Sequence, residues 1–397
     1  MIQANSALAE SGAGETSRVP DSYLPALTGL RGIAACWVLL FHVWQFSGSP
    51  TLAISVFDIT PIARFGYMGV DLFFVLSGFL LSLPFLRADV QHRPMPRLSR
   101  FWIRRCRRVL PACYVQLVII VATLWWFGQS ALITPLSIAS HALLIQNLFA
   151  GIAPLNAVYW TMPIEWDFYV VLPLMALMLM RLRPPLACGV FIALSIAYRM
   201  ACYRAFLDPA WARFVDYGTI MQLPARLDEF FFGILGAWLF LYHPISARTA
   251  HSWIIAGTAG IVIAITGISI HGDVLLHPQL PWTVMYFTWI GLSFGAIVRG
   301  AAAQSGRGIW FGGRVLGWLG LISYSLYLWH YPLLKVAQHF NWNATGSALA
   351  MLQNIALLVP VIFAVSWLSQ HFVERPFLVE RSSRPATHGM PASIDDR

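Results

Sequence analysis

The stretch LPALTGLRGIAACWVLLFH, residues 24–42, decides the fold of this chain. Only Arg31 and His42 within it can carry a charge. A helix needs about 20 predominantly apolar residues to cross the hydrocarbon core of a membrane. The stretch therefore predicts a transmembrane helix, and its two ionisable side chains are candidates for function because charge is costly inside a bilayer.

Similar apolar runs recur along the chain. Of its 397 residues, 58% are hydrophobic and 11% are charged, and the mean hydropathy is +0.65. One water-surrounded core could not bury so much apolar surface, whereas many lipid-facing helices could. We predict an all-α integral membrane protein with about ten transmembrane helices, near residues 26–46, 67–86, 109–127, 164–182, 185–201, 226–243, 252–270, 281–299, 314–334 and 349–369. Polar residues and Pro135 interrupt the run 134–150, which predicts one re-entrant or interfacial helix.

The basic residues predict the orientation in the membrane. Eight arginines fall between Arg87 and Arg108, and an inner N-terminus places most other arginines on the inner side as well. Cytoplasmic loops carry such an excess. We therefore predict a multi-pass protein of the inner (plasma) membrane with cytoplasmic N- and C-termini. The net charge of +9 is then explained by arginines that set the orientation of the chain in the membrane, and it does not indicate binding to nucleic acid. The membrane domain is expected at residues 24–378, between disordered tails at 1–23 and 379–397.

Cysteine usage argues against two further classes of site. The five cysteines are odd in number, and none has a C-x-x-C spacing. Cysteines at such spacings hold metals, and even sets form disulfide frameworks in small secreted proteins. The cysteines therefore predict neither a disulfide framework nor a zinc site. We expect no metal site elsewhere and no bound cofactor.

The ionisable residues within the spans have a geometry of their own. Arg31 and His42 are separated by about 1100° of helical turn, so they share one helix face about 16 Å apart. Glu165 is expected at a depth near that of His42. The outer half of the spans is also predicted to hold Asp71, Arg226, Asp228 and His330. One helix face would thus connect an outer polar cluster to a basic inner mouth.

This arrangement suits the transfer of an acyl group. A histidine can take a proton from a hydroxyl, and a nearby carboxylate can fix the histidine tautomer. Arginine clusters match the oxygens of phosphate groups. An acyl-CoA with its nucleotide at the inner arginines and its acyl arm extended to His42 would use both. The alternative is a proton-coupled transporter of a polar or anionic solute, which two related halves with broken helices would favour. We find no such repeat.

Seven separated motifs resemble the membrane acyltransferase-3 family, whose members acylate surface sugars and some small molecules. In chain order they are LPALTGLRGIAACWVLLFH (24–42), GVDLFFVLSGFLL (69–81), FWIRRCRRVLPACY (101–114), WTMPIEWDFY (160–169), RLDEFFFG (226–233), WLGLISYSLYLWHYP (318–332) and VERPF (373–377). The resemblance covers roughly residues 24–378 and places the glutamate of the family on Glu165.

The resemblance implies a membrane O-acyltransferase, most often an O-acetyltransferase with acetyl-CoA as co-substrate. It assigns His42 as general base or transient acyl carrier, and Glu165 as a residue that orients His42 or binds the acceptor. The phosphates of the donor would be bound by Arg104, Arg105 and Arg108. Arg31 would either join them in binding the donor or hold the core carboxylates. The acceptor or cavity side would hold Asp71, Arg226, Asp228, Tyr324 and His330. The expected partners are membrane lipid, acyl-CoA, and a surface glycan, lipid-linked glycan or small hydroxylated metabolite.

The end of the chain also bears on the class of protein. Because little sequence follows the last motif, we expect a stand-alone form without the hydrolase-like domain that some relatives carry. Thr161, Pro163, Trp166 and Asp167 depart from the family pattern on the side interpreted as the acceptor side. The sequence leaves the acceptor, the acyl chain and the oligomeric state open.

Overall fold

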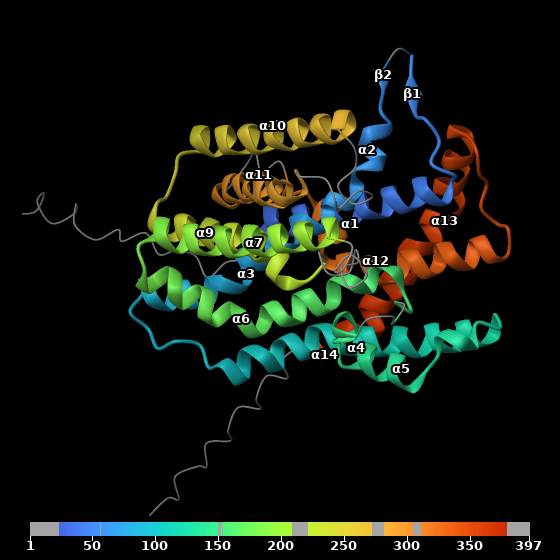
Figure 1. Cartoon of the computed structure of the whole chain (residues 1–397), viewed down its shortest axis with the longest axis horizontal. Helices are drawn as coiled ribbons and strands as arrows, with labels where there is room; N and C mark the ends of the chain where they lie inside the picture. The colour runs from blue at the N-terminus through green and yellow to red at the C-terminus, as the bar shows by residue number, and fades with distance from the viewer. Residues whose placement is uncertain are drawn as a thin grey trace, which may run out of the picture.

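The computed structural model describes residues 24–378, apart from residues 56, 150, 151, 153, 209–220, 272–281 and 305–310. The tails predicted to be disordered, 1–23 and 379–397, lie outside the described residues. The described part is almost entirely helical, which confirms the predicted all-α class (Figure 1). It also contains one short antiparallel ladder that the sequence did not predict, between β1 (Ala53–Ile54) and β2 (Phe57–Asp58).

In the described part of the chain, ten long helices occupy the ten predicted apolar runs. They are α1 (Pro25–Phe46), α3 (Gly69–Val90), α4 (Leu98–Trp126), α6 (Thr161–Arg181), α7 (Pro184–Leu207), α9 (Leu223–Tyr242), α10 (Ala247–His271), α11 (Thr283–Ala303), α12 (Arg314–His339) and α13 (Ala348–Ser369). Eight of them are long and apolar enough to cross a membrane, as expected of a multi-pass membrane protein.

The other two long helices, α9 and α12, fall outside that criterion for different reasons. The first two turns of α9 contain Arg226, Asp228 and Glu229. Serine, tyrosine and histidine side chains lower the hydropathy of α12. The sequence predicts about ten membrane spans. Among the described residues, eight of the ten long helices have the length and apolarity that a span requires.

The segment 134–150 contains a short helix that does not cross the membrane. Its helix, α5 (Pro135–Ala142), has 8 residues and is followed by a 3₁₀ turn at Gln146–Leu148. Eight residues rise only about 12 Å, less than half the thickness of the hydrocarbon core. The side chain of Thr134 begins α5 by accepting a hydrogen bond from the Ser137 N–H at 3.0 Å. The chain thus has a non-crossing helix here, as predicted.

Short elements connect the long helices and define the two ends of the bundle. They are α2 (Thr60–Arg64), α14 (Arg375–Leu378), 3₁₀ turns at Gly66–Met68, Ser130–Leu132 and Ala157–Trp160, and a π turn at Gln370–Glu374.

We call the end of the bundle where β1 and β2 join α1 to α3 the hairpin end. The opposite end, where the chain passes from α3 to α4, is called the arginine end.

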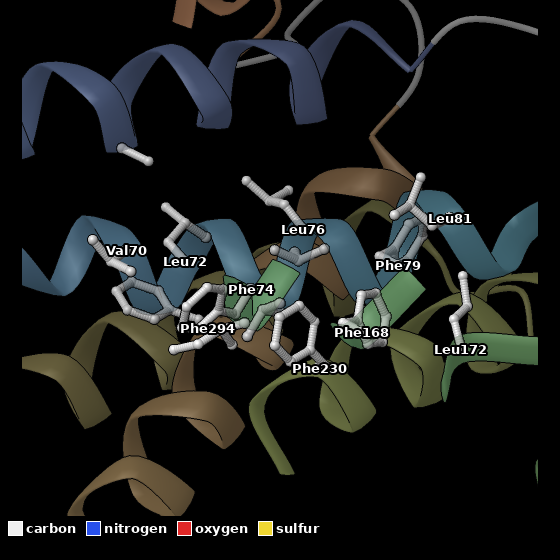
Figure 2. Packing of buried hydrophobic residues seen from close by; sticks show 14 of the residues in the cluster. Val70, Leu72, Phe74, Leu76, Phe79, Leu81, Phe168, Leu172, Phe230 and Phe294 are labelled. Carbon is white, nitrogen blue, oxygen red and sulfur yellow. The ribbon is translucent and has the colours of Figure 1, made fainter. Parts of the chain in front are cut away.

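Helix α3 packs closely against α9 and α6. Phe230 of α9 stacks on Phe74 of α3 and on Phe168 of α6, with ring centroids 4.7 and 3.9 Å away (Figure 2). Glycines let the backbones of α3 and α9 meet. A Cβ atom added to Gly78 would lie 2.0 Å from the carbonyl oxygen of Phe230, and one added to Gly233 would lie 2.0 Å from that of Val75.

A proline in α12 creates a hydrogen-bond acceptor inside the bundle. Pro332 has no N–H, so the carbonyl of Leu328, one turn earlier, lacks its helical partner. The side-chain amides of Gln116 and Asn156 both donate to this carbonyl, Asn156 at 3.3 Å. The Tyr159 hydroxyl in turn donates to Gln116 Oε1 at 2.6 Å. This bonding attaches α12 to α4 and to the segment that leads into α6.

Gly78→Ala is expected to destabilise the bundle, because its methyl group would push α3 away from the Phe230 carbonyl of α9. Overpacking of this kind costs about 1–3 kcal/mol, which would lower the midpoint of thermal unfolding in detergent. Gly189→Ala is the matched control, since its added Cβ meets no atom within 4 Å. Equal midpoints for the two variants would contradict the close approach of α3 and α9.

Candidate active site

A cavity with an empty volume of about 790 Å³ lies between α1, α3, α4, α6 and α12. Its wall on α3 extends from Val70 to Leu81, which is about 16 Å of helix. The polar side chains of the wall are Arg31, Ser77, Arg105, Arg108, Thr161, Glu165, Tyr169, Ser323, Tyr324 and Tyr327. The 790 Å³ include space at the open side of the cavity. Three arginines and one glutamate line it, so positive charge exceeds negative charge.

The three arginines of the cavity differ in their bonding. Arg108 is held by an ion pair, with its Nη1 3.1 Å from Glu374 Oε2, and its guanidinium lies 5.8 Å from the centre of the Tyr324 ring. Arg31 and Arg105 make no ion pair with another described residue, and the Nε of each is buried without a hydrogen-bond partner there. Their donors are available to an anion in the cavity.

Arg104 does not line this cavity, although the sequence grouped it with its neighbours. The face of α4 that meets the cavity carries Arg105, Arg108 and Val109. Successive helical residues point about 100° apart, so Arg104 is turned away from Arg105. Arg104 is half-buried, while Arg107 is exposed.

Glu165 lies in the cavity wall and is bound to residues other than His42. Its Oε1 accepts a hydrogen bond from the Tyr169 hydroxyl at 2.6 Å and from Ser77 Oγ at 3.4 Å. Tyr169 follows Glu165 by one turn of α6, where side chains share a face. The predicted pairing of Glu165 with His42 is not formed, and Glu165 instead shares the cavity with Arg31.

His42 meets α12 through a second histidine. Its Nδ1 lies 3.0 Å from the Val38 carbonyl oxygen and 3.1 Å from Nε2 of His330. Nδ1 of His330 lies 2.9 Å from the Leu326 carbonyl oxygen. The His330 ring is 5.8 Å from that of Tyr327, which lines the cavity. His42 is thus connected to the cavity through the rings of His330 and Tyr327.

The carboxylates predicted on the acceptor side belong to two buried groups of ion pairs. Nη1 of Arg226 lies 2.7 Å from Asp71 Oδ1 and 2.8 Å from Glu229 Oε1, which joins α3 to α9. Arg199 of α7 binds the two oxygens of Asp228 at 3.2 and 2.7 Å. Arg226 and Asp71 border a separate hollow of about 230 Å³. Buried charges need such partners, so these groups fix helices to one another.

Sequence reasoning did not pair Arg199, Glu229 and Glu374 with the charged residues that they contact in the structure. Each is buried, with 2%, 0% and 1% of its surface exposed. The available signal was physical: an ionisable residue within or beside an apolar helix requires an opposite charge nearby. Spacing along the chain does not say which helix supplies that charge.

The fold and the cavity define a helical membrane protein with an arginine-lined cavity among its helices. The part of the chain that the structure describes contains no group of three or more His, Cys, Asp or Glu side chains placed to hold a metal ion. The sequence profile of the acyltransferase-3 family, an acyltransferase domain, matches residues 24–371. The chain belongs to this family, which confirms the resemblance of its motifs.

Several curated proteins are similar to most of the chain. The peptidoglycan O-acetyltransferase OatA of Listeria monocytogenes is 28% identical, over 91% of this chain and 57% of its own length. The putative peptidoglycan O-acetyltransferase YrhL of Bacillus subtilis is 27% identical, over 89% and 55%. The putative membrane-bound transacylase BcsY of Komagataeibacter xylinus is 28% identical, over 94% and 87%. The chain spans just over half the length of the first two. No solved structure is significantly similar to it.

Asp228→Asn is expected to destabilise the protein strongly, because it leaves the buried Arg199 without its counter-charge. Breaking one side of such a pair costs about 3–5 kcal/mol, whereas replacing both charges with apolar groups is often neutral. The double variant Arg199→Met with Asp228→Leu should therefore unfold at a higher temperature than Asp228→Asn. Asp58→Asn, in the exposed β2, is the control. If Asp228→Asn unfolds like the control, the pair does not hold α7 to α9.

Proposed function

We propose that this protein is a membrane O-acyltransferase, most simply an O-acetyltransferase, that moves an acyl group from acyl-CoA to a hydroxyl of a glycan. One observation carries the proposal: an elongated cavity presents the unpaired donors of Arg31 and Arg105 and is connected through Tyr327 to a pair of histidines. The reaction class is supported by the family and by the names of the relatives.

The donor fits the chemistry of the cavity. Coenzyme A carries phosphates, which guanidinium groups bind through parallel hydrogen bonds, and a long arm that suits an elongated space. We assign phosphate binding to Arg31 and Arg105. Arg108, whose charge is balanced by Glu374, would form part of the cavity wall without binding phosphate. Arg104 would lie at the margin of the donor site. The arginine end would then face the cytoplasm, where the excess of basic residues also places it.

We assign the proton transfer to His42. Its free nitrogen would take the proton of the acceptor hydroxyl while the hydroxyl oxygen attacks the thioester carbonyl. The carbon–sulfur bond then breaks, and the leaving thiolate of CoA takes the proton from His42. In the other order of events, His42 attacks first and carries the acyl group. Glu165, held by Tyr169 and Ser77, would hydrogen-bond the acceptor in the cavity.

The proposed acceptor is a sugar hydroxyl of an envelope glycan. Two of the relatives are named for peptidoglycan, which makes glycan fragments of that type the first acceptors to test. Tyr324 lies in the cavity wall, with its hydroxyl bonded to the Val109 carbonyl at 2.8 Å. Asp71, Arg226 and Asp228 would act indirectly, by fixing the helices around the cavity.

His42→Gln should abolish acyl transfer in a folded protein, because glutamine cannot accept the hydroxyl proton. The assay uses reconstituted protein, labelled acetyl-CoA and peptidoglycan-type glycan fragments, and measures label in the glycan. A general base contributes at least about 100-fold, so the rate should fall by that much or more. His251→Gln, at the start of α10, is the control. Solute transport without release of CoA would favour a transporter and overturn the proposal.

Arg105→Gln should weaken the binding of acetyl-CoA by about 10-fold, or about 1.4 kcal/mol, because one charged contact to phosphate is lost. The affinity should also depend less on salt, since salt screens that contact. Arg107→Gln is the matched control, an exposed arginine on the same helix. Measured by titration of purified protein, equal affinities in the two variants would exclude Arg105 from the donor site.

A further inference from the structure

The hydrogen bonds around the two histidines determine which nitrogens carry protons. His330 is 1% exposed, and its Nδ1 lies 2.9 Å from the Leu326 carbonyl oxygen, so Nδ1 must be the protonated nitrogen of His330. His42 Nδ1 lies 3.0 Å from the Val38 carbonyl oxygen, so it must carry a proton for the same reason. A carbonyl oxygen accepts hydrogen bonds and cannot donate one.

The contact between the rings then has only one consistent direction. Nε2 of His330 and Nδ1 of His42 are 3.1 Å apart, and Nδ1 of His42 already bears a proton. Nε2 of His330 is therefore the acceptor. A doubly protonated His330 would place a cation in a buried position, with no carboxylate among its described hydrogen-bond partners. This assignment leaves Nε2 of His42 as the nitrogen with a free lone pair.

From this geometry, and given the proposed function, we propose that His330 is the positioning residue of His42. It stays neutral and accepts the Nδ1–H of His42, so that Nε2 of His42 receives the proton of the acceptor hydroxyl. The Nδ1 proton does not move. The lone pair of His330 then stabilises the imidazolium that forms, a task that a carboxylate performs in the Ser-His-Asp triad.

The packing of α1 on α12 holds the two rings at this distance. A Cβ added to Gly320 of α12 would lie 1.9 Å from the Thr28 carbonyl oxygen of α1, and one added to Gly32 would lie 2.9 Å from the Leu316 carbonyl oxygen. The two helices are thus in backbone contact about ten residues before the histidines. Tyr331 meets the His42 ring edge-on, with centroids 5.2 Å apart.

The proton assignment can be tested without an acceptor. Full-length protein is labelled with ¹⁵N-histidine in lipid bilayers, and the signals of the pair are identified by their loss in His42→Gln and His330→Gln. At a pH where both rings are neutral, we expect protonated Nδ1 and bare Nε2 in each ring. A correlation across the hydrogen bond should join His42 Nδ1 to His330 Nε2. Protonation of neutral His42 at Nε2, or absence of that correlation, overturns the proposal.

The role in transfer is tested by three variants of α12. His330→Leu should lower kcat by on the order of 10–100-fold, the loss typical of residues that orient a metal-bound imidazole through a hydrogen bond, and leave the KM for acetyl-CoA unchanged. His330→Gln, whose amide oxygen can still accept from His42, should recover much of the rate. His339→Leu, about two and a half turns further along α12, is the control. Equal losses of kcat in His330→Leu and His330→Gln would show that His330 only packs against His42, which would overturn its role as the positioning residue.

The two experiments separate failure of this proposal from failure of the proposed function. An inactive wild-type protein that shows the expected ¹⁵N correlation would refute acyl transfer and retain the histidine pair. An active protein that lacks the correlation would retain acyl transfer and refute the role of His330.

Discussion

An arginine inside a helical bundle needs partners for its charge, and this requirement organises the interior of the protein. Arg226 satisfies it with Asp71 and Glu229, and Arg199 with Asp228. The pairs Arg226–Asp71 and Arg199–Asp228 each join two helices, whereas Glu229 lies on the same helix as Arg226. The cost of burying these charges is offset by contacts that specify which helices are neighbours. The requirement also identifies the candidate ligand site, because Arg31 and Arg105 line a cavity and form no ion pair with a described carboxylate.

The protein places its carboxylates and its histidines in different surroundings. The buried carboxylates described above bind arginines, and the half-buried Glu165 binds hydroxyl groups. The two imidazoles bind backbone carbonyls and each other. A neutral partner suits a base in a membrane, because a carboxylate beside His42 would add a charge that itself needs compensation. The predicted pairing of Glu165 with His42 followed the common carboxylate–histidine pattern and did not consider this cost.

The fold could be predicted from the sequence to a greater extent than the site. Apolar runs of sufficient length must become helices in a bilayer, because lipid offers no other partner for the backbone. The site depends in addition on how each helix is rotated and which helix lies next to it. The spacing of Arg226 and Asp228 shows that they do not pair with each other, since residues two apart do not share a helix face. Spacing does not show that Arg226 pairs with Asp71 and Asp228 with Arg199. It likewise could not show that His330 lies against His42.

The hydrogen bonds to the Leu328 carbonyl have a consequence for the histidine pair. This carbonyl is two residues from His330, and Pro332 frees it for side chains outside α12. Gln116 and Asn156 therefore anchor the helical turn that carries the imidazole, although neither forms a hydrogen bond with it. The orientation of His330 is consequently set by α4 and by the segment before α6. Gln116 and Asn156 take no part in proton transfer, yet replacing either would disturb the angle between the imidazoles of His42 and His330. Selection for the chemistry of the histidine pair therefore acts on these two amides as well.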